Sequence, residues 1–157
     1  MLVILCAEEE EAKHINHPKA KVIVTGVGVV NIIKNLPKIP PKAKIINVGY
    51  AGSNKYPVGS VISVNRVERF HRTIVNEQPI DLVPCYVSDL CYTVDDFVNT
   101  SYVMEIPLID MELYYLAARF LNIKSLKIVS DNLSITEHRK ADLEESWKEV
   151  NNILGHL

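Results

Sequence analysis

Three short runs rich in branched apolar residues within the first 50 positions limit the folds that this chain can adopt. They occupy residues 2–6, 21–25 and 44–48. Runs of this length and composition are typical of strands that are buried on both faces. The segments between them fit helices, at residues 8–15 with an acidic first turn and at residues 29–36 ahead of Pro37. Because strands and helices alternate with short connections, the pattern predicts a parallel sheet with right-handed crossovers.

The rest of the chain adds further strands and two helices. Short apolar or loosely alternating stretches predict strands at residues 59–67, 82–87, 101–107 and 125–129. Residues 110–121 are apolar nearly all round apart from Glu112 and Arg119, which predicts a largely buried helix. The last helix is expected to begin at the capping-box spacing of Ser134 and Glu137. Its apolar stripe consists of Leu143, Trp147, Val150 and Leu154.

The composition argues for one globular domain and against a nucleic-acid partner. The chain has 157 residues, of which 48% are apolar and 23% charged, and no linker or repeat is visible, so a single domain over residues 1–157 is expected. Lys and Arg number 17 against 19 Asp and Glu, which gives a net charge of -2. Such a chain has no basic surplus with which to neutralise the phosphates of a polymer.

The cellular setting expected from the sequence is the cytoplasm. The longest apolar runs are too short to span a bilayer, and no basic segment precedes the first run as in a signal peptide. The three cysteines are an odd number without a close C-x-x-C pair, which favours reduced thiols over disulfides or zinc. The histidines are scattered in polar surroundings, so we expect no metal site.

Glycines and polar residues gather where the predicted strands end. Five of the six glycines lie between Gly26 and Gly59. Open α/β sheets bind ligands at the carboxyl ends of their strands, where glycine lets a ligand approach the backbone closely. Tight turns alone would explain one or two of these glycines. A dinucleotide-binding fingerprint does not fit, because Asn31 replaces its third glycine.

Short motifs in a fixed order make the sequence recognisable. They are residues 7–11 (AEEEE), 25–31 (TGVGVVN), 47–52 (NVGYAG), 58–60 (VGS), 69–71 (RFH), 95–98 (DDFV), 110–112 (DME) and 130–131 (SD). In this order the sequence resembles the purine nucleoside phosphorylase/uridine phosphorylase superfamily, and most closely its 5′-methylthioadenosine/S-adenosylhomocysteine nucleosidase branch. The resemblance implies a three-layer α/β/α fold with a central mixed, mostly parallel sheet, reduced in size, and an enzyme that cleaves N-glycosidic bonds without a cofactor.

The resemblance also implies three acidic roles, each with a structural alternative. Asp131 matches the acid that protonates the departing purine, although it could instead cap the last turn. Glu112 matches the acceptor of the ribose hydroxyls, although Arg119 on the same helix face could hold it in an ion pair. Glu11 matches the base that activates water, although a lone glutamate in this acidic cluster would ordinarily face solvent.

Further binding positions follow from the same resemblance. Phe97 matches the aromatic residue that stacks on the purine, and the Val98 backbone matches the group that reads the base edge. Met111 would lie beneath the ribose, but Phe97 and Met111 could equally be core residues. The sugar side of the pocket is completed by Ala51, Gly52 and Ser130. Gly28 and Arg69 form the candidate anion site that a phosphorylase would need.

Two departures from the family bear on the substrate and the partner. Only residues 16–20 separate the first helix from the next strand, and a helical segment is missing between residues 72 and 91, so the chain is shorter than its relatives. Tyr50 stands where the family has a small residue, and its phenol could fill part of the pocket or bind substrate. A reduced subunit with apolar surface to cover is expected to form a homodimer or a homohexamer.

Hydrolysis is favoured over phosphorolysis for an electrostatic reason. The carboxylates at residues 8–11 would repel phosphate and suit a base that activates water. The expected function is therefore that of a purine nucleosidase acting on a small-molecule purine nucleoside. A phosphorylase with Arg69 or Arg72 at its anion site is the alternative within the superfamily. A catalytically silent nucleoside-binding homologue is the third possibility.

Overall fold

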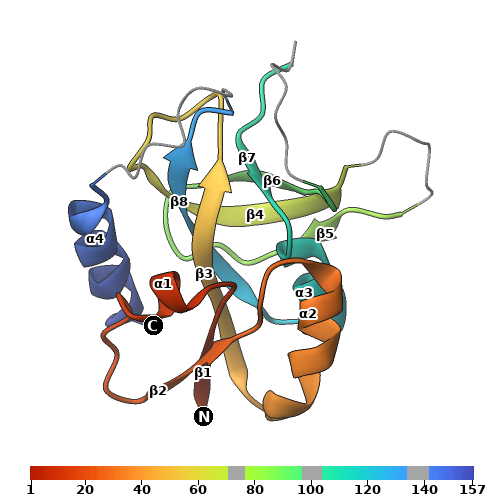
Figure 1. Ribbon diagram of the computed structural model, residues 1–157, viewed down its shortest axis with the longest axis vertical. Coiled ribbons are helices and arrows are strands. Elements are labelled where there is room, and N and C mark those ends of the chain that lie inside the picture. The colour runs from red at the N-terminus through yellow and green to blue at the C-terminus, as the bar shows by residue number, and fades with distance from the viewer. Residues whose placement is uncertain (71–76, 97–103, 134–141) are drawn as a thin grey trace.

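The fold is built on a mixed sheet that closes on itself (Figure 1). The computed structural model describes residues 1–70, 77–96, 104–133 and 142–157. The strands in this part of the chain are β1 (Leu2–Cys6), β2 (Ala20–Val24), β3 (Lys44–Gly52), β4 (Val61–Arg69), β5 (Ile80–Asp81), β6 (Ser88–Thr93), β7 (Leu108–Asp110) and β8 (Lys124–Asp131). The strand β3 pairs with β8, β8 with β4, β4 with β6, β6 with β7, and β7 again with β3, so these strands form a ring.

Most of the pairings are parallel. Neighbouring strands run parallel in the pairs β1–β2, β1–β3, β3–β8, β4–β6 and β6–β7, and antiparallel in β3–β7, β4–β5 and β4–β8. The predicted α/β class with a mixed, mostly parallel sheet is therefore confirmed. The closure of β3, β8, β4, β6 and β7 into a ring is a feature that the sequence pattern did not predict.

Helices cover two sides of the sheet, and each of the two sides has its own buried apolar cluster. They are α1 (Glu9–Ala12), α2 (Gly28–Asn35), the 3-10 turn η1 (Leu36–Lys38), α3 (Leu113–Arg119) and α4 (Glu144–Leu154). Ile32 of α2 and Leu116 of α3 belong to one buried cluster. Trp147 and Val150 of α4 belong to another, on the side of the sheet away from α2 and α3 (Figure 1). The predicted apolar stripe of the last helix is thus confirmed, whereas Ser134 and Glu137 lie outside the described residues.

The predicted strands at residues 2–6, 21–25, 44–48, 59–67 and 125–129 are confirmed within a few positions. The strand predicted at residues 82–87 is wrong, because the chain there joins β5 to β6 and leaves Val83 and Val87 exposed. Leu82 is buried, but the burial that the two valines suggested is not found. The strand predicted at residues 101–107 is described only in part. Residues 104–107 do not form a strand, and residues 101–103 lie outside the described residues.

The helix predicted at residues 29–36 is confirmed by α2, but two other predicted helices are shorter than expected. The segment 8–15 contains only the one-turn helix α1, and the segment 110–121 contains α3 after three residues that belong to β7 and its exit. Cys6, Cys85 and Cys91 are free thiols. Within the described ranges no helix is long and apolar enough to cross a membrane.

Candidate active site

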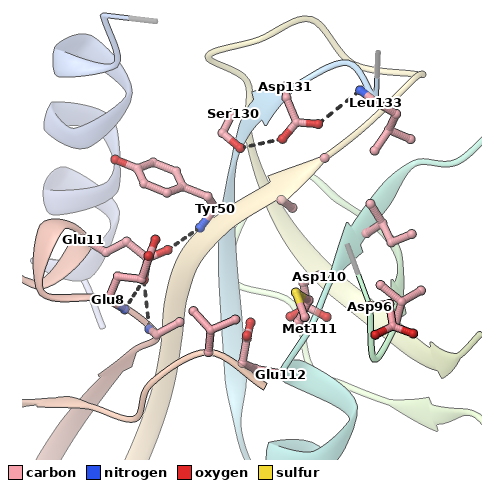
Figure 2. Close-up of a pocket in the computed structure, with 16 residues that line it drawn as sticks. Glu8, Glu11, Tyr50, Asp96, Asp110, Met111, Glu112, Ser130, Asp131 and Leu133 are labelled. Carbon is pink, nitrogen blue, oxygen red and sulfur yellow. Dashed lines mark hydrogen bonds between the residues drawn. The ribbon is translucent and has the colours of Figure 1, made fainter. Parts of the chain in front are cut away.

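A cavity of about 270 Å³ opens where several strands end (Figure 2). The last residues of β3, β7 and β8 line it, together with residues that follow β1, β2 and β6. The lining residues are Ala7, Glu8, Glu11, Val27, Tyr50, Ala51, Gly52, Val94, Asp96, Ile109, Asp110, Met111, Glu112, Ser130, Asp131 and Leu133. Three acidic side chains that lie far apart in the sequence, Glu11, Glu112 and Asp131, therefore share one cavity.

Glu11 is buried on α1 and is held by backbone N–H groups from two directions. Its Oε2 accepts hydrogen bonds from the N–H groups of Ala7 at 2.8 Å and Glu8 at 2.9 Å, and its Oε1 accepts one from Tyr50 at 2.8 Å (Figure 2). Only 3% of the residue is exposed, so the solvated position considered from the sequence does not apply. Burial raises the pKa of Glu11, and the backbone hydrogen bonds only partly oppose this shift.

Gly49 explains how Glu11 can lie so close to β3. A Cβ atom at this position would stand 2.9 Å from Glu11 Oε1, which is too close for a side chain. The glycine therefore leaves room for the carboxylate against the strand, where it can reach the N–H of Tyr50. The NVGYAG motif thus contributes a gap as well as a hydrogen-bond donor to the site.

Glu112 lies at the entry to α3 and is 7% exposed. Its Oε1 accepts a hydrogen bond from the Gly28 N–H at 3.0 Å, which links the glycine turn before α2 to the helix α3. The ion pair with Arg119 considered from the sequence is not the contact that holds it, because Arg119 is exposed with its guanidinium over the Phe120 ring. Burial, and then the nearby carboxylate of Asp110, raises the pKa of Glu112 to about 7.

Asp131 ends β8 at an irregularity in the pairing with β3. The register shifts after Ala51, which pairs with Val129, so that Gly52 stands opposite Asp131 and Ser130 is skipped. Asp131 Oδ2 accepts a hydrogen bond from the Ser130 hydroxyl at 3.0 Å, and Oδ1 accepts one from the Leu133 N–H at 3.1 Å (Figure 2). Leu133 has a φ of 63°, a left-handed conformation that is uncommon for leucine. Asp131 therefore stabilises a turn as well as facing the cavity.

A buried ion pair beneath the carboxylates was missed from the sequence. Lys127 Nζ lies 2.8 Å from Asp110 Oδ2, and Asp110 also accepts hydrogen bonds from the Thr93 hydroxyl at 2.6 Å and the Leu113 N–H at 3.0 Å. The signal was a lysine between Leu126 and Ile128 in an otherwise apolar strand, because a charge buried in a core needs a partner.

The remaining predicted positions divide into three groups. Ala51, Gly52, Met111 and Ser130 line the cavity as expected. Phe97 and Val98 lie outside the described residues. Gly28 and Arg69 are not among the lining residues: the Gly28 N–H binds Glu112, and the two terminal nitrogens of the Arg69 guanidinium donate to Glu77 at 2.6 Å and Asp95 at 2.8 Å.

Tyr50 takes up neither of the roles considered for it. Its backbone borders the cavity, but its ring points toward α4 (Figure 2). The hydroxyl donates to Glu10 Oε2 at 2.8 Å and accepts a hydrogen bond from Trp147 Nε1 at 3.1 Å. Within the described residues, no group of His, Cys, Asp and Glu side chains has the arrangement of a metal site.

Comparison with known proteins identifies the fold. No protein-family model and no curated protein matches the sequence. Among solved structures, MTAN from Chlamydia trachomatis is similar with a TM-score of 0.79 at 16% identity, over 99% of this chain and 97% of that one. A 5′-methylthioadenosine/S-adenosylhomocysteine nucleosidase from Helicobacter pylori is similar with a TM-score of 0.79 at 16% identity, over 99% and 98%. The chain therefore has the fold of these nucleosidases, as the order of the motifs predicted.

Proposed function

We propose that this chain is a purine nucleosidase that cleaves the N-glycosidic bond of a 5′-modified purine nucleoside by attack of water. The observation that carries the proposal is the convergence of Glu11, Glu112 and Asp131 on one cavity. Cleavage passes through a sugar with oxocarbenium character, as in glycoside hydrolysis, and therefore needs an acid, a base and an anchor for the sugar. The three carboxyl groups supply one candidate for each of these roles.

In this proposal the three groups act at different atoms of the substrate. Asp131 protonates the purine as it departs, and Ser130 and the Leu133 N–H orient its carboxyl group. Glu112 in its ionised form accepts hydrogen bonds from the ribose hydroxyls, with Met111 beside the sugar. Glu11 orients water and takes its proton, and a raised pKa suits a base that works near neutrality. The positive charge that develops on the ribose is stabilised by the surrounding carboxylates.

The structural neighbours support this substrate class. One structure of the Chlamydia trachomatis nucleosidase holds MTA and another holds adenine. The Helicobacter pylori nucleosidase is bound to butyl-thio-DADMe-Immucillin-A. At 14–16% identity these proteins share the fold with our chain, and the carboxylates in the cavity extend the argument from fold to substrate.

Two contacts favour water over phosphate as the nucleophile. The Gly28 N–H is occupied by Glu112, and the Arg69 guanidinium is paired with Glu77 and Asp95. Glu8, Glu11 and Glu112 line the cavity, and their negative charge repels phosphate.

The test is release of free base from 5′-methylthioadenosine, adenosine and inosine, each with and without phosphate. We expect release that does not depend on phosphate and that falls in Glu11→Gln to a low but measurable residual rate. Release that requires phosphate would instead identify a phosphorylase. Retained binding of adenine without release from any nucleoside would identify a silent nucleoside-binding homologue and overturn the proposal.

The expected assembly and location remain part of the proposal. Val30 and Ile33 on α2 are each 60% exposed, an apolar pair that a homodimer or homohexamer would cover. Light scattering at micromolar concentration tests this, and a monomer would contradict it.

The three-layer order of the family fold and a cytoplasmic location also stay predictions.

A further inference from the structure

One residue of β3 holds two neighbouring carboxylates of α1. The Tyr50 N–H donates to Glu11 Oε1 at 2.8 Å, and the Tyr50 hydroxyl donates to Glu10 Oε2 at 2.8 Å. The first contact is made by the backbone at the edge of the cavity, and the second by the side chain on the far side of the strand. A small residue at position 50, as the family resemblance led us to expect, could not make this second contact.

The helix α4 contacts the Tyr50 ring and hydroxyl through Trp147. Trp147 is 3% exposed, its Nε1–H donates to the Tyr50 hydroxyl at 3.1 Å, and the two rings meet edge to face with centroids 5.7 Å apart. His14 stacks on Trp147 with centroids 5.0 Å apart and pairs with Glu10 at 3.0 Å. Contacts therefore run in a closed circuit from Tyr50 through Glu10, His14 and Trp147 back to Tyr50.

Helix α1 needs such support because it has only four residues. A single helical turn is not stable by itself in water, so its position depends on tertiary contacts. Among the described residues, the hydrogen bonds to the Glu11 carboxylate come from backbone N–H groups, and its position depends on where this turn lies. A misplacement of about 1 Å in a catalytic group can cost up to about 100-fold in rate.

We propose that Tyr50 is a positioning residue for Glu11, which acts through its hydroxyl on Glu10 and through Trp147 to fix α1 against β3 and α4. The inference rests on the proposed function for its effect on catalysis, but the positioning itself is a property of the fold. It assigns to the last helix a role in placing the proposed base, although α4 contributes no residue to the lining of the cavity among the described residues.

The main test replaces the hydroxyl alone. Tyr50→Phe keeps the ring against Trp147 and is expected to lower kcat for methylthioadenosine hydrolysis about tenfold, with KM within about twofold, because water attack is affected and nucleoside binding is not. Tyr86→Phe is the matched control, since Tyr86 donates to Glu149 of α4 at 2.6 Å on an exposed surface. We expect its kcat and KM to equal those of the wild type.

A second comparison separates positioning from a general structural effect. In the Glu11→Gln background, Tyr50→Phe should lower the residual rate no further, because the group that it positions has already been removed. A further tenfold loss in that background would overturn the proposal. So would a kcat for Tyr50→Phe equal to that of Tyr86→Phe, or a change confined to KM.

Amide hydrogen exchange tests the positioning without any substrate. The N–H groups of Ala7 and Glu8, which donate to Glu11, should exchange about tenfold faster in Tyr50→Phe and unchanged in Tyr86→Phe. Glu10→Ala breaks the same contact from an exposed position and should give the same acceleration, which protects the test if Tyr50→Phe fails to fold. Unchanged exchange in both variants overturns the inference. If the wild type releases no base, the proposed function fails, and the exchange result still decides the positioning.

Discussion

The ammonium group of Lys127 lies 2.8 Å from the Asp110 carboxylate, and the exposed fractions of the two side chains are 1% and 0%. Gly49 stands opposite Lys127 in the pairing of β3 with β8, so the ion pair lies next to the strand that carries the Glu11 contacts. Burial lowers the pKa of Lys127, but the surrounding acidic groups, Asp110 first among them, together raise it by more, so the lysine remains charged. The positively charged ammonium group of Lys127 therefore lies close to a cavity that is lined by carboxylates.

Replacing this lysine should destabilise the fold strongly. Lys127→Met leaves the Asp110 carboxylate buried without its partner, and we expect the free energy of unfolding to fall by about 3–5 kcal/mol, measured by urea denaturation. Lys55→Met is the control, because Lys55 makes an equally short contact of 2.7 Å to Asp89 but at the surface. The control should lose far less stability. If the free energy of unfolding fell equally in the two variants, removing a partner from the buried pair would be no more destabilising than removing one from the surface pair.

The pKa of Glu112 predicts how stability depends on pH. The folded-state pKa of about 7 lies above the model-peptide value of 4.5, so the folded state binds the proton more tightly than the unfolded state. This group therefore contributes most below pH 4.5, and its contribution is lost as pH rises through 7, by up to about 3 kcal/mol. Glu112→Gln should remove that part of the decline and be the more stable protein at pH 8. Equal declines in both proteins between pH 5 and pH 8 would contradict the prediction.

Asp131→Asn should separate binding from catalysis. The asparagine oxygen can still accept from the Leu133 N–H and its NH2 group can donate to the Ser130 hydroxyl, but the amide cannot supply a proton to the departing purine. We expect kcat to fall by about 10²–10⁴ while adenine binding, measured by calorimetry, changes little. Asp81→Asn is the control, since Asp81 pairs with Arg66 on the surface. A kcat for Asp131→Asn close to that of the control would remove Asp131 from the mechanism.

The parts of the structure that the sequence predicted well depend on local patterns or on ordered motifs. The buried strands at residues 2–6 and 125–129 follow from their branched apolar runs, and the motif order identified Glu11, Glu112 and Asp131 before any geometry was known. Their burial and convergence could not follow from local pattern, since they come from α1, the exit of β7 and the end of β8. Most of the contacts that orient them come from backbone N–H groups, which carry no sequence signal, and the Ser130 hydroxyl is the side-chain donor beside Asp131.

The features that were missed are those that depend on pairing between distant segments. The ring closes only because β4 pairs with β8 on one side and with β6 on the other. The strand predicted at residues 82–87 failed because Val83 and Val87 have strand-forming side chains but face solvent. The partner of Lys127 could not be chosen from the sequence among the many carboxylates of the chain. Tyr50 was singled out as a departure, but its partners on α1 and α4 are visible only in three dimensions.

Gly52→Ala tests whether the proposed acid is held by close packing. A Cβ atom at Gly52 would stand 2.9 Å from Asp131 Oδ1 and 2.4 Å from Leu133 Cδ2, so both side chains would have to move. We expect kcat to fall about tenfold to 100-fold and the free energy of unfolding to fall by about 1–3 kcal/mol. Gly155→Ala is the control, because Gly155 has a φ of -63° and its nearest contact would be 3.4 Å. If both variants keep wild-type kcat, the place of Asp131 in the cavity does not depend on the glycine opposite it.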